Sequence, residues 1–374
     1  MVTNDNCIRV LHIFYALNRA GAETAVMNFY RKIDRTNIQF DFLAVKNSLE
    51  RYDYEDEIVA LGGKIHKLKH DKGFMSYFKA LYLFFKNHKE YKIIHIHITA
   101  NSFIPLLAAK LQGIPIRIVH SHSINYNRNL KTRITKPFIK YLCTDYLACG
   151  KQAGEFLFGK RMFSKRGNYI KNSIDTERFK YNEVIRKRIR HDVFNIQDNQ
   201  LVIGCVARFS KEKDHKFLLN VFNEVLKRRA NSFLYLVGDG ELKSATKNYA
   251  KSLGIESNVV FTGGVSNVNE YLQGFDIFIL TSDYEGFPVT LIEAQASGLK
   301  CFASNQIPKE SSVTELISYI SKNESFEYWA EMIIDSIPYE RKDMSSAIVS
   351  SGFDSKTTAK WIENFYISKT KAIR

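Results

Sequence analysis

With 374 residues the chain is longer than one hydrophobic core usually covers, so its length predicts two domains and excludes a single small module. The composition is 45% hydrophobic and 25% charged with 19 Gly and 6 Pro, which is typical of a folded globular protein and excludes a disordered or collagen-like chain. The net charge of +15 is uneven: residues 1–200 hold 34 Lys and Arg against 18 Asp and Glu (+16), whereas residues 201–374 hold 20 against 21 (−1).

From the N-terminus onward we find no signal-peptide pattern and no apolar run of the roughly 18 residues that a spanning helix needs, so neither is expected. Short β-branched and aromatic runs alternate with longer helical patterns, which is the signature of parallel sheets covered by helices. In the first half, strands are predicted at residues 9–16, 40–45, 64–68, 92–98, 116–121 and 145–149. In the second half they are predicted at residues 201–207, 233–238, 259–263, 276–281 and 301–304.

These elements predict two Rossmann-like, doubly wound α/β domains. Apolar periodicity fades between the halves, so we place the first domain at residues 1–172, a linker region at 173–200 and the second domain at 201–352. Ligands of such folds bind beyond the carboxyl ends of the strands, so a shared cleft between the domains is expected. The five cysteines are scattered without a C-x-x-C pair, which disfavours disulfides and structural zinc and favours a reducing cytoplasm.

Glycines occupy two predicted strand-to-helix turns. Gly21 follows the first strand, where it allows a tight turn facing a phosphate, and Gly238 and Gly240 follow the strand at 233–238, where they allow the backbone to approach a ligand. The full dinucleotide-binding pattern is missing, and so is a P-loop.

Two histidines, His120 and His122, end a predicted strand on one side of the sheet. The pattern leaves open ordinary polar packing, a role facing the cleft for one of them, or a metal site with the histidines at 95 and 97. No carboxylate spacing completes a recognisable metal site, so we expect none. If a histidine faces the cleft, Tyr126 and Arg128 would line the acceptor side.

The surrounding segment is strongly basic, since residues 101–144 hold seven Lys and Arg and no Asp or Glu. Such a field favours polyanions, and charge alone leaves open anionic lipid, nucleic acid, phosphorylated substrates or a simply solvated surface.

Two cations follow the first strand of the second half. Arg208 lies where the strand leaves the sheet, and Lys213 lies just ahead of a predicted helix. A guanidinium and an ammonium together suit two linked phosphates, although surface cations of no function are common.

Two carboxylates surround a predicted helix that begins near Pro288 and ends at Gly298. Glu293 lies in the otherwise apolar stripe of this helix, and Glu285 precedes the helix at the end of a strand. A carboxylate on an apolar face needs hydrogen-bond donors or a cation, which ligand hydroxyls, the backbone or an arginine would supply.

The chain resembles the retaining GT-B glycosyltransferases of family 4, especially those that build bacterial exopolysaccharide and capsule. The resemblance is carried by RAGAETAVMNFYRKID, HSHS, YIKNSID, ARFSKEKD, LVGDGEL and EGFPVTLIEAQASG, in that order. The last contains the family's E-x7-E motif, from Glu285 to Glu293.

The resemblance implies a GT-B fold whose second domain binds a nucleotide-sugar, with the diphosphate on Arg208 and Lys213 and the ribose hydroxyls on Glu293. Glu285 would lie near the donor sugar, and His122, or alternatively His120, beside the reacting carbon. Sugar or phosphate would also contact the backbone at Gly286, Phe287, Val289 and Thr290. A final helix within residues 353–374 would return to the first domain.

The implied activity is transfer of a sugar from a nucleotide-sugar, which we expect to be a UDP-sugar, to a lipid-linked glycan at the cytoplasmic membrane face. The resemblance further implies retained configuration and no metal or other cofactor. We expect the protein to be peripheral on the anionic inner membrane and not to bind nucleic acid. The alternatives are a nucleotide-sugar 2-epimerase of GT-B fold and a non-enzymatic polyanion-binding protein. The donor sugar, the base, the acceptor linkage and the oligomeric state are left open.

Overall fold

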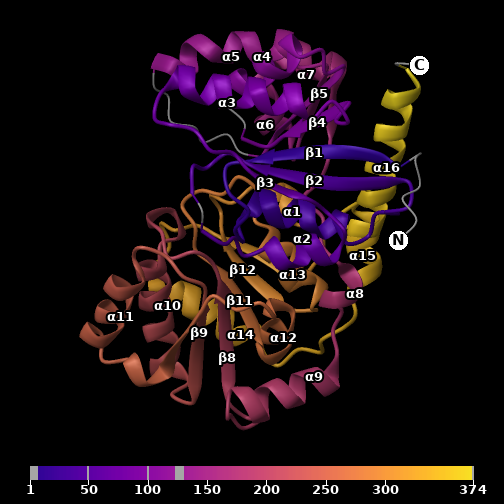
Figure 1. The fold of residues 1–374 in the computed structure, drawn as a ribbon. Helices are drawn as coiled ribbons and strands as arrows, with labels where there is room; N and C mark the ends of the chain where they lie inside the picture. The colour runs from indigo at the N-terminus through magenta and orange to yellow at the C-terminus, as the bar shows by residue number, and fades with distance from the viewer. Residues whose placement is uncertain (1–6, 49, 99–100, 123–129, 373–374) are drawn as a thin grey trace. The chain divides into compact units, whose positions relative to one another are not determined.

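The computed structural model describes residues 7–48, 50–98, 101–122 and 130–372 (Figure 1). The chain divides into two compact units, Met1–Ser173 with Ser355–Arg374, and Ile174–Asp354. Within the described ranges, no helix combines the length and the apolar character needed to cross a bilayer.

The first unit contains a seven-stranded parallel sheet in the order β3-β2-β1-β4-β5-β6-β7. The strands are β1 (Ile8–Phe14), β2 (Ile38–Ala44), β3 (Ile65–Lys67), β4 (Ile93–Ile96), β5 (Ile116–Ser121), β6 (Asp145–Ala148) and β7 (Gly167–Tyr169). The helices are α1 (Gly21–Tyr30), α2 (Glu55–Ala60), α3 (Phe74–Asn87), α4 (Phe103–Leu111), α5 (Leu130–Leu142), α6 (Lys151–Phe158), α7 (Lys160–Arg166) and α16 (Ser355–Lys371).

Two hydrophobic clusters form the core of this unit. One includes Leu81 and Phe85 of α3 together with Ala108 of α4. The other joins α1 to the C-terminal helix α16, whose Ile362 and Tyr366 pack with residues of β1 and β2. Figure 1 labels α16 in yellow at the end of the chain. The last helix of the sequence is therefore part of the first unit.

The second unit contains a six-stranded parallel sheet in the order β10-β9-β8-β11-β12-β13. The strands are β8 (Leu201–Val206), β9 (Ser232–Val237), β10 (Val259–Gly263), β11 (Ile277–Leu280), β12 (Lys300–Ser304) and β13 (Ile317–Ile320). The α-helices are α8 (Thr176–Phe179), α9 (Glu183–Arg188), α10 (His215–Arg228), α11 (Lys243–Ser252), α12 (Val268–Gly274), α13 (Val289–Ala296), α14 (Phe326–Asp335) and α15 (Ser345–Ser350). Single turns of 3₁₀-helix lie at Lys211–Lys213, Glu256–Asn258 and Lys309–Ser311, and a π-helical turn lies at Ile189–Val193.

The eleven strands predicted from the sequence are all present, each within two residues of its predicted ends. The sequence did not predict β7 and β13, which lie at sheet edges. Apart from the buried Ile320, their residues are partly or fully exposed, so neither strand is the continuous buried run that marks an interior strand.

Residues 173–200 differ from the predicted linker region, because α8, α9 and the π-helical turn belong to the second unit. Two arginines of this segment bind Asp276 next to β11: Arg186 at 2.5 Å and Arg190 at 3.0 Å. Arg190 is fully buried and also donates to the carbonyls of Gly274 and Gln200. Charged residues that looked like a solvated connection are therefore internal hydrogen-bond donors.

Candidate active site

In both sheets the strand order reverses beside the first strand, between β1 and β4 in the first unit and between β8 and β11 in the second. Open α/β sheets bind ligands at the carboxyl ends of such neighbouring strands, because the loops there diverge to opposite faces. Lys213 and Glu285 follow β8 and β11, the strands at this position in the second unit.

An ion pair connects the loops after β8 and β11. Lys213 Nζ lies 2.5 Å from Glu285 Oε1, and the Ser282 hydroxyl donates to the same oxygen at 2.7 Å. Both side chains are largely buried. The loops are further joined by the Thr281 hydroxyl, which donates to the carbonyl of Asp214 at 3.1 Å. A cation and a carboxylate predicted to act on one ligand are thus held together.

The Glu293 carboxylate lies on α13, which begins after Pro288 as predicted. The side chain is 8% exposed, and no hydrogen bond to its carboxylate is present among the described residues. Burial raises the pKa of Glu293 to about 7, against a smaller opposing effect of Arg178. The carboxylate therefore has unused capacity to accept hydrogen bonds.

The backbone at the start of α13 is fixed by packing. Phe287 stacks on Phe353 with ring centroids 5.2 Å apart, and Val289 and Thr290 form the first residues of the helix directly after Gly286 and Pro288. The amides of Val289 and Leu291 donate to the carbonyls of Phe287 and Pro288. Among the described residues no such acceptor is present for the amides of Gly286, Phe287 and Thr290, so these are suited to anionic or hydroxyl oxygens.

The two glycines after β9 pack against the chain itself. A Cβ on Gly238 would lie 2.1 Å from the Ala207 carbonyl oxygen, and one on Gly240 would lie 2.5 Å from that of Phe209. Close contact with the loop after β8 accounts for both glycines. Arg208 in that loop is 72% exposed and pairs with Glu241 at 3.2 Å, so its guanidinium does not join the Lys213–Glu285 pair in this structure.

In the first unit, Gly21 is the first residue of α1, and a Cβ placed there would meet no atom within 4 Å. His120 lies on β5 and is buried, with both ring nitrogens lacking partners among the described residues. His122 follows the end of β5, is partly exposed, and bonds through Nε2 to His97 Nδ1 at 2.8 Å. Tyr126 and Arg128 lie outside the described residues.

Five histidines lie on one side of this sheet and form two overlapping groups of three. In each group, one nitrogen from each ring lies within 4.8 Å of the chosen nitrogens of the other two. The groups are His12, His95 and His97, and His97, His120 and His122. In the described part of the chain neither group includes a carboxylate or a thiolate. His12 Nδ1 lies 3.0 Å from His97 Nε2, and His97 Nδ1 lies 2.8 Å from His122 Nε2. The ligand atoms of a tetrahedral zinc ion lie roughly 3.3 Å apart, so these shorter distances are those of hydrogen bonds.

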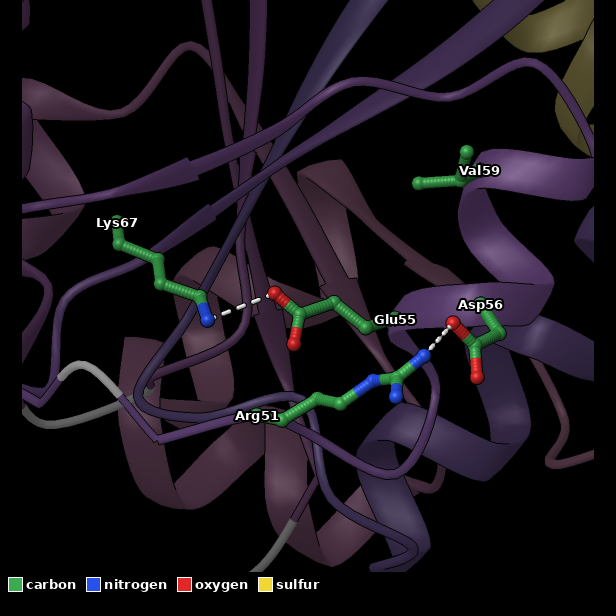
Figure 2. A pocket seen from close by; sticks show the side chains of 5 residues that line it. All are labelled: Arg51, Glu55, Asp56, Val59 and Lys67. Carbon is green, nitrogen blue, oxygen red and sulfur yellow. Dashed lines mark hydrogen bonds and ion pairs between the residues drawn. The ribbon is translucent and has the colours of Figure 1, made fainter.

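A surface pocket of about 480 Å³ in the first unit contains none of the predicted site residues (Figure 2). Its charged side chains pair with one another, Lys67 with Glu55 at 2.7 Å and Arg51 with Asp56. The pocket thus offers no uncompensated charge to a ligand.

Three contributors were missed by the sequence analysis. Ser282 and Arg178 act on the two carboxylates, and His12 extends the histidine group. For His12 the only signal in the sequence was its place on a predicted strand, two residues before Phe14 and therefore on the same side of that strand. No local pattern distinguished Ser282 or Arg178.

Comparison with known proteins gives matches to both units. The family model described as Glycosyltransferase Family 4 matches residues 19–178, and the one described as Glycosyl transferases group 1 matches residues 186–345. The chain is 33% identical to a Bacillus subtilis (strain 168) protein named as the glycosyltransferase EpsF, covering 98% of each chain.

Two further relatives are more distant. The Staphylococcus aureus capsular polysaccharide biosynthesis glycosyltransferase CapH is 28% identical, covering 97% of this chain and 99% of that one. The Escherichia coli UDP-Gal:alpha-D-GlcNAc-diphosphoundecaprenol alpha-1,3-galactosyltransferase is 23% identical, covering 82% of this chain and 81% of that one.

The solved structure of Anabaena HepE in complex with UDP has the same fold, with a TM-score of 0.78 at 16% identity, covering 97% of this chain and all of that one. This likeness agrees with the two parallel Rossmann-like sheets of the chain and with the relative that matches over almost its whole length. The chain belongs to the family 4, group 1 glycosyltransferases of GT-B fold and is itself a glycosyltransferase.

Proposed function

We propose that the protein transfers a sugar from a UDP-sugar to a lipid-linked glycan in exopolysaccharide or capsule biosynthesis, with retention of anomeric configuration. The observation that carries the donor assignment is the Lys213–Glu285 pair across the β8–β11 switch point. The names of the relatives support the rest, since one acts on UDP-Gal and a diphosphoundecaprenol-linked acceptor and another serves capsular polysaccharide biosynthesis.

The proposed donor site uses two kinds of group in the second unit. Lys213, Arg208 and the amides at the start of α13 stabilise the negative charge that develops on the departing diphosphate, as fixed donors do in other transfer reactions. Because these groups supply the charge stabilisation, we propose that no metal is needed. Glu293 accepts hydrogen bonds from the ribose hydroxyls, which gives its unpartnered carboxylate the donors that it lacks.

In the first unit we assign His122 to the donor sugar, with His120 as the alternative. We prefer His122 because it follows the carboxyl end of β5, where ligands of such sheets bind, whereas His120 is buried within the strand. Tyr126 and Arg128 remain the proposed acceptor residues.

We further propose that the enzyme works peripherally at the cytoplasmic membrane face and binds no nucleic acid. Helix α5 exposes Ile134, Phe138 and Tyr141, which are 58%, 51% and 68% exposed and share one helix face by their i, i+4, i+7 spacing. This stripe lies within the segment 101–144 that carries seven basic and no acidic residues. Apolar side chains among cations suit a surface of anionic lipid.

The test is donor binding by calorimetry with a panel of nucleotide-sugars, followed by transfer to an undecaprenyl-diphosphate-linked acceptor. Lys213→Ala and Glu293→Ala should each weaken donor binding about tenfold or more, because each removes a charged hydrogen-bonding group. Lys227→Ala removes an exposed lysine of the same unit and should bind donor normally.

Transfer should survive excess chelator, and the product should keep the donor's anomeric configuration. Unchanged donor affinity in both variants would remove the proposed site, and loss of activity in chelator with rescue by a divalent ion would remove the metal-free mechanism. Interconversion of the donor without acceptor would instead identify a 2-epimerase.

A further inference from the structure

Lys322, which follows β13, holds two carboxylates that come from two different loops. Its Nζ lies 2.5 Å from Asp214 Oδ2 and also pairs with Asp283. The Lys322 side chain is 14% exposed, and its ammonium lies 4.9 Å from the centroid of the Phe217 ring. In the part of the chain that the structure describes, neither carboxylate pairs with another cation. One ammonium therefore connects the chain after β13 to the loops after β8 and β11.

The two carboxylates lie next to the proposed donor site in the sequence. Asp214 follows Lys213, and Asp283 lies two positions before Glu285. The amide of Asp283 also joins the two loops, since it donates to the Glu212 carbonyl at 2.8 Å. A shift of either carboxylate therefore moves the backbone that carries one member of the Lys213–Glu285 pair.

The backbone on either side of Lys322 is anchored to its own part of the fold. The indole N–H of Trp329, a fully buried residue of α14, donates to the Ser321 carbonyl at 3.1 Å. The amide of Asn323 donates to the Ser321 hydroxyl oxygen at 3.1 Å. Lys322 is therefore held in place by groups that belong to neither of the loops that it joins.

Charge explains why this lysine matters for the two loops. Two carboxylates that share one ammonium are close together, so they repel one another once the ammonium is removed. Asp283 is 56% exposed and is partly screened by water, which limits what its pairing adds to the stability of the unit. We therefore expect loss of Lys322 to change the position of the loops and not whether the unit folds.

We propose that Lys322 is a positioning residue, which neutralises Asp214 and Asp283 together and so keeps the loops after β8 and β11 closed on one another. The Lys213–Glu285 pair then keeps its contact. This inference rests on the proposed function, in which Lys213 binds the diphosphate. Closure of the two loops is nevertheless a property of the protein alone and is measurable without a donor.

Hydrogen exchange followed by NMR on the full chain, without substrate, tests loop closure at the amide of residue 283. This amide donates to the Glu212 carbonyl, so its protection falls when the loops separate. In Lys322→Met, which keeps most of the apolar side chain, the protection factor at residue 283 should fall about tenfold or more. In Lys322→Arg, whose guanidinium has donors for both carboxylates, protection should be largely retained.

A double variant separates the effect of charge from that of packing. In Lys322→Met with Asp283→Asn the repulsion is absent and the Asn amide can donate to Asp214, so protection at residue 283 should return to within about threefold of wild type. Unaltered protection in folded Lys322→Met would overturn the proposal. So would a double variant that is no better protected than Lys322→Met.

Calorimetry with UDP connects loop closure to the donor site. Lys322→Met should weaken UDP binding about fivefold or more, and the double variant should recover most of the lost affinity. The matched control is Lys187→Met, which removes a lysine that is 71% exposed and pairs with Glu183, and it should bind UDP like wild type. Wild-type affinity in Lys322→Met would overturn the positioning role if Lys213→Ala weakens binding.

Failure of the proposed function gives a different result. If the wild-type protein does not bind UDP, or if Lys213→Ala binds UDP normally, the donor assignment is wrong. Hydrogen exchange at residue 283 would still decide whether Lys322 closes the two loops.

Discussion

At the scale of single residues, the chemistry of Glu293 follows from its surroundings. The i, i+3, i+4 pattern of the sequence placed a carboxylate in an apolar stripe, and the structure confirms that Ile292 and Ala296 of the same helix are fully buried. Sequence could not show which group compensates it, because Arg178 comes from a different helix more than a hundred residues earlier. Local periodicity predicts that the Glu293 side chain is buried, whereas the groups that interact with it depend on tertiary contacts.

The raised pKa of Glu293 predicts a pH-dependent stability. The carboxyl titrates at its ordinary 4.5 when unfolded and at about 7 when folded, so between these values the folded state holds a proton that the unfolded state has lost. Stability therefore falls as pH rises through this window. Glu293→Gln removes the effect, and its free energy of unfolding relative to wild type should rise by about 2–3 kcal/mol from pH 5 to pH 8.

Urea unfolding measures this difference. Trp329 is fully buried in the second unit, and replacing the other tryptophan by Trp361→Phe leaves it as the only indole reporter. Glu331→Gln, a change of an exposed carboxylate on α14, serves as the control. If the curves for Glu293→Gln and wild type remain parallel across this pH range, burial does not alter the ionisation of Glu293.

At the scale of elements, the start of α10 determines where Lys213 lies. Asp214 is the N-cap of this helix in a left-handed conformation, with φ of 45°, and its Oδ1 accepts from the amide of Phe217 at 3.2 Å. Its Oδ2 pairs with Lys322 at 2.5 Å. The sequence predicted the helix and the lysine ahead of it, but the cap conformation is a backbone property that a hydrophobic pattern does not reveal.

Asp214→Ala should destabilise the second unit by about 1–2 kcal/mol, because it removes the cap and places a Cβ-bearing residue without a polar side chain in the left-handed region. It should also weaken donor binding through the displaced Lys213. Asp214→Asn keeps a capping oxygen and tolerates this conformation, so most of the stability should remain. Urea unfolding followed by Trp329 fluorescence and calorimetry with the donor check both effects, and equal stability of the two variants would contradict the capping argument.

At the scale of the whole molecule, the fold depends on contacts that sequence order does not display. The strands were predictable because each buried run is continuous, and the E-x7-E segment because its residues are close in sequence. The bond from His95 Nδ1 to the Tyr366 hydroxyl, 2.6 Å long, joins residues 271 positions apart and places the last helix on the first sheet. Resemblance to a family suggested that return, whereas no pattern within residues 353–374 identifies its partner.

The uneven charge of the molecule predicts binding to anionic membranes. The half that carries +16 includes the exposed apolar stripe of α5, and cations with apolar side chains together favour a surface of anionic lipid. In co-sedimentation the protein should bind vesicles of phosphatidylglycerol and phosphatidylcholine but not of phosphatidylcholine alone, and binding should weaken with salt because the Debye length shortens.

Phe138→Ser with Tyr141→Ser should reduce the partition coefficient at least about tenfold, since burying one large apolar side chain contributes about 1.5–3 kcal/mol. The matched control is Val184→Ser with Val349→Ser, which removes exposed apolar side chains from the second unit, and it should bind like wild type. If neutral vesicles bind the protein equally, or if the α5 variant binds as tightly as the control, this surface does not bind anionic membranes.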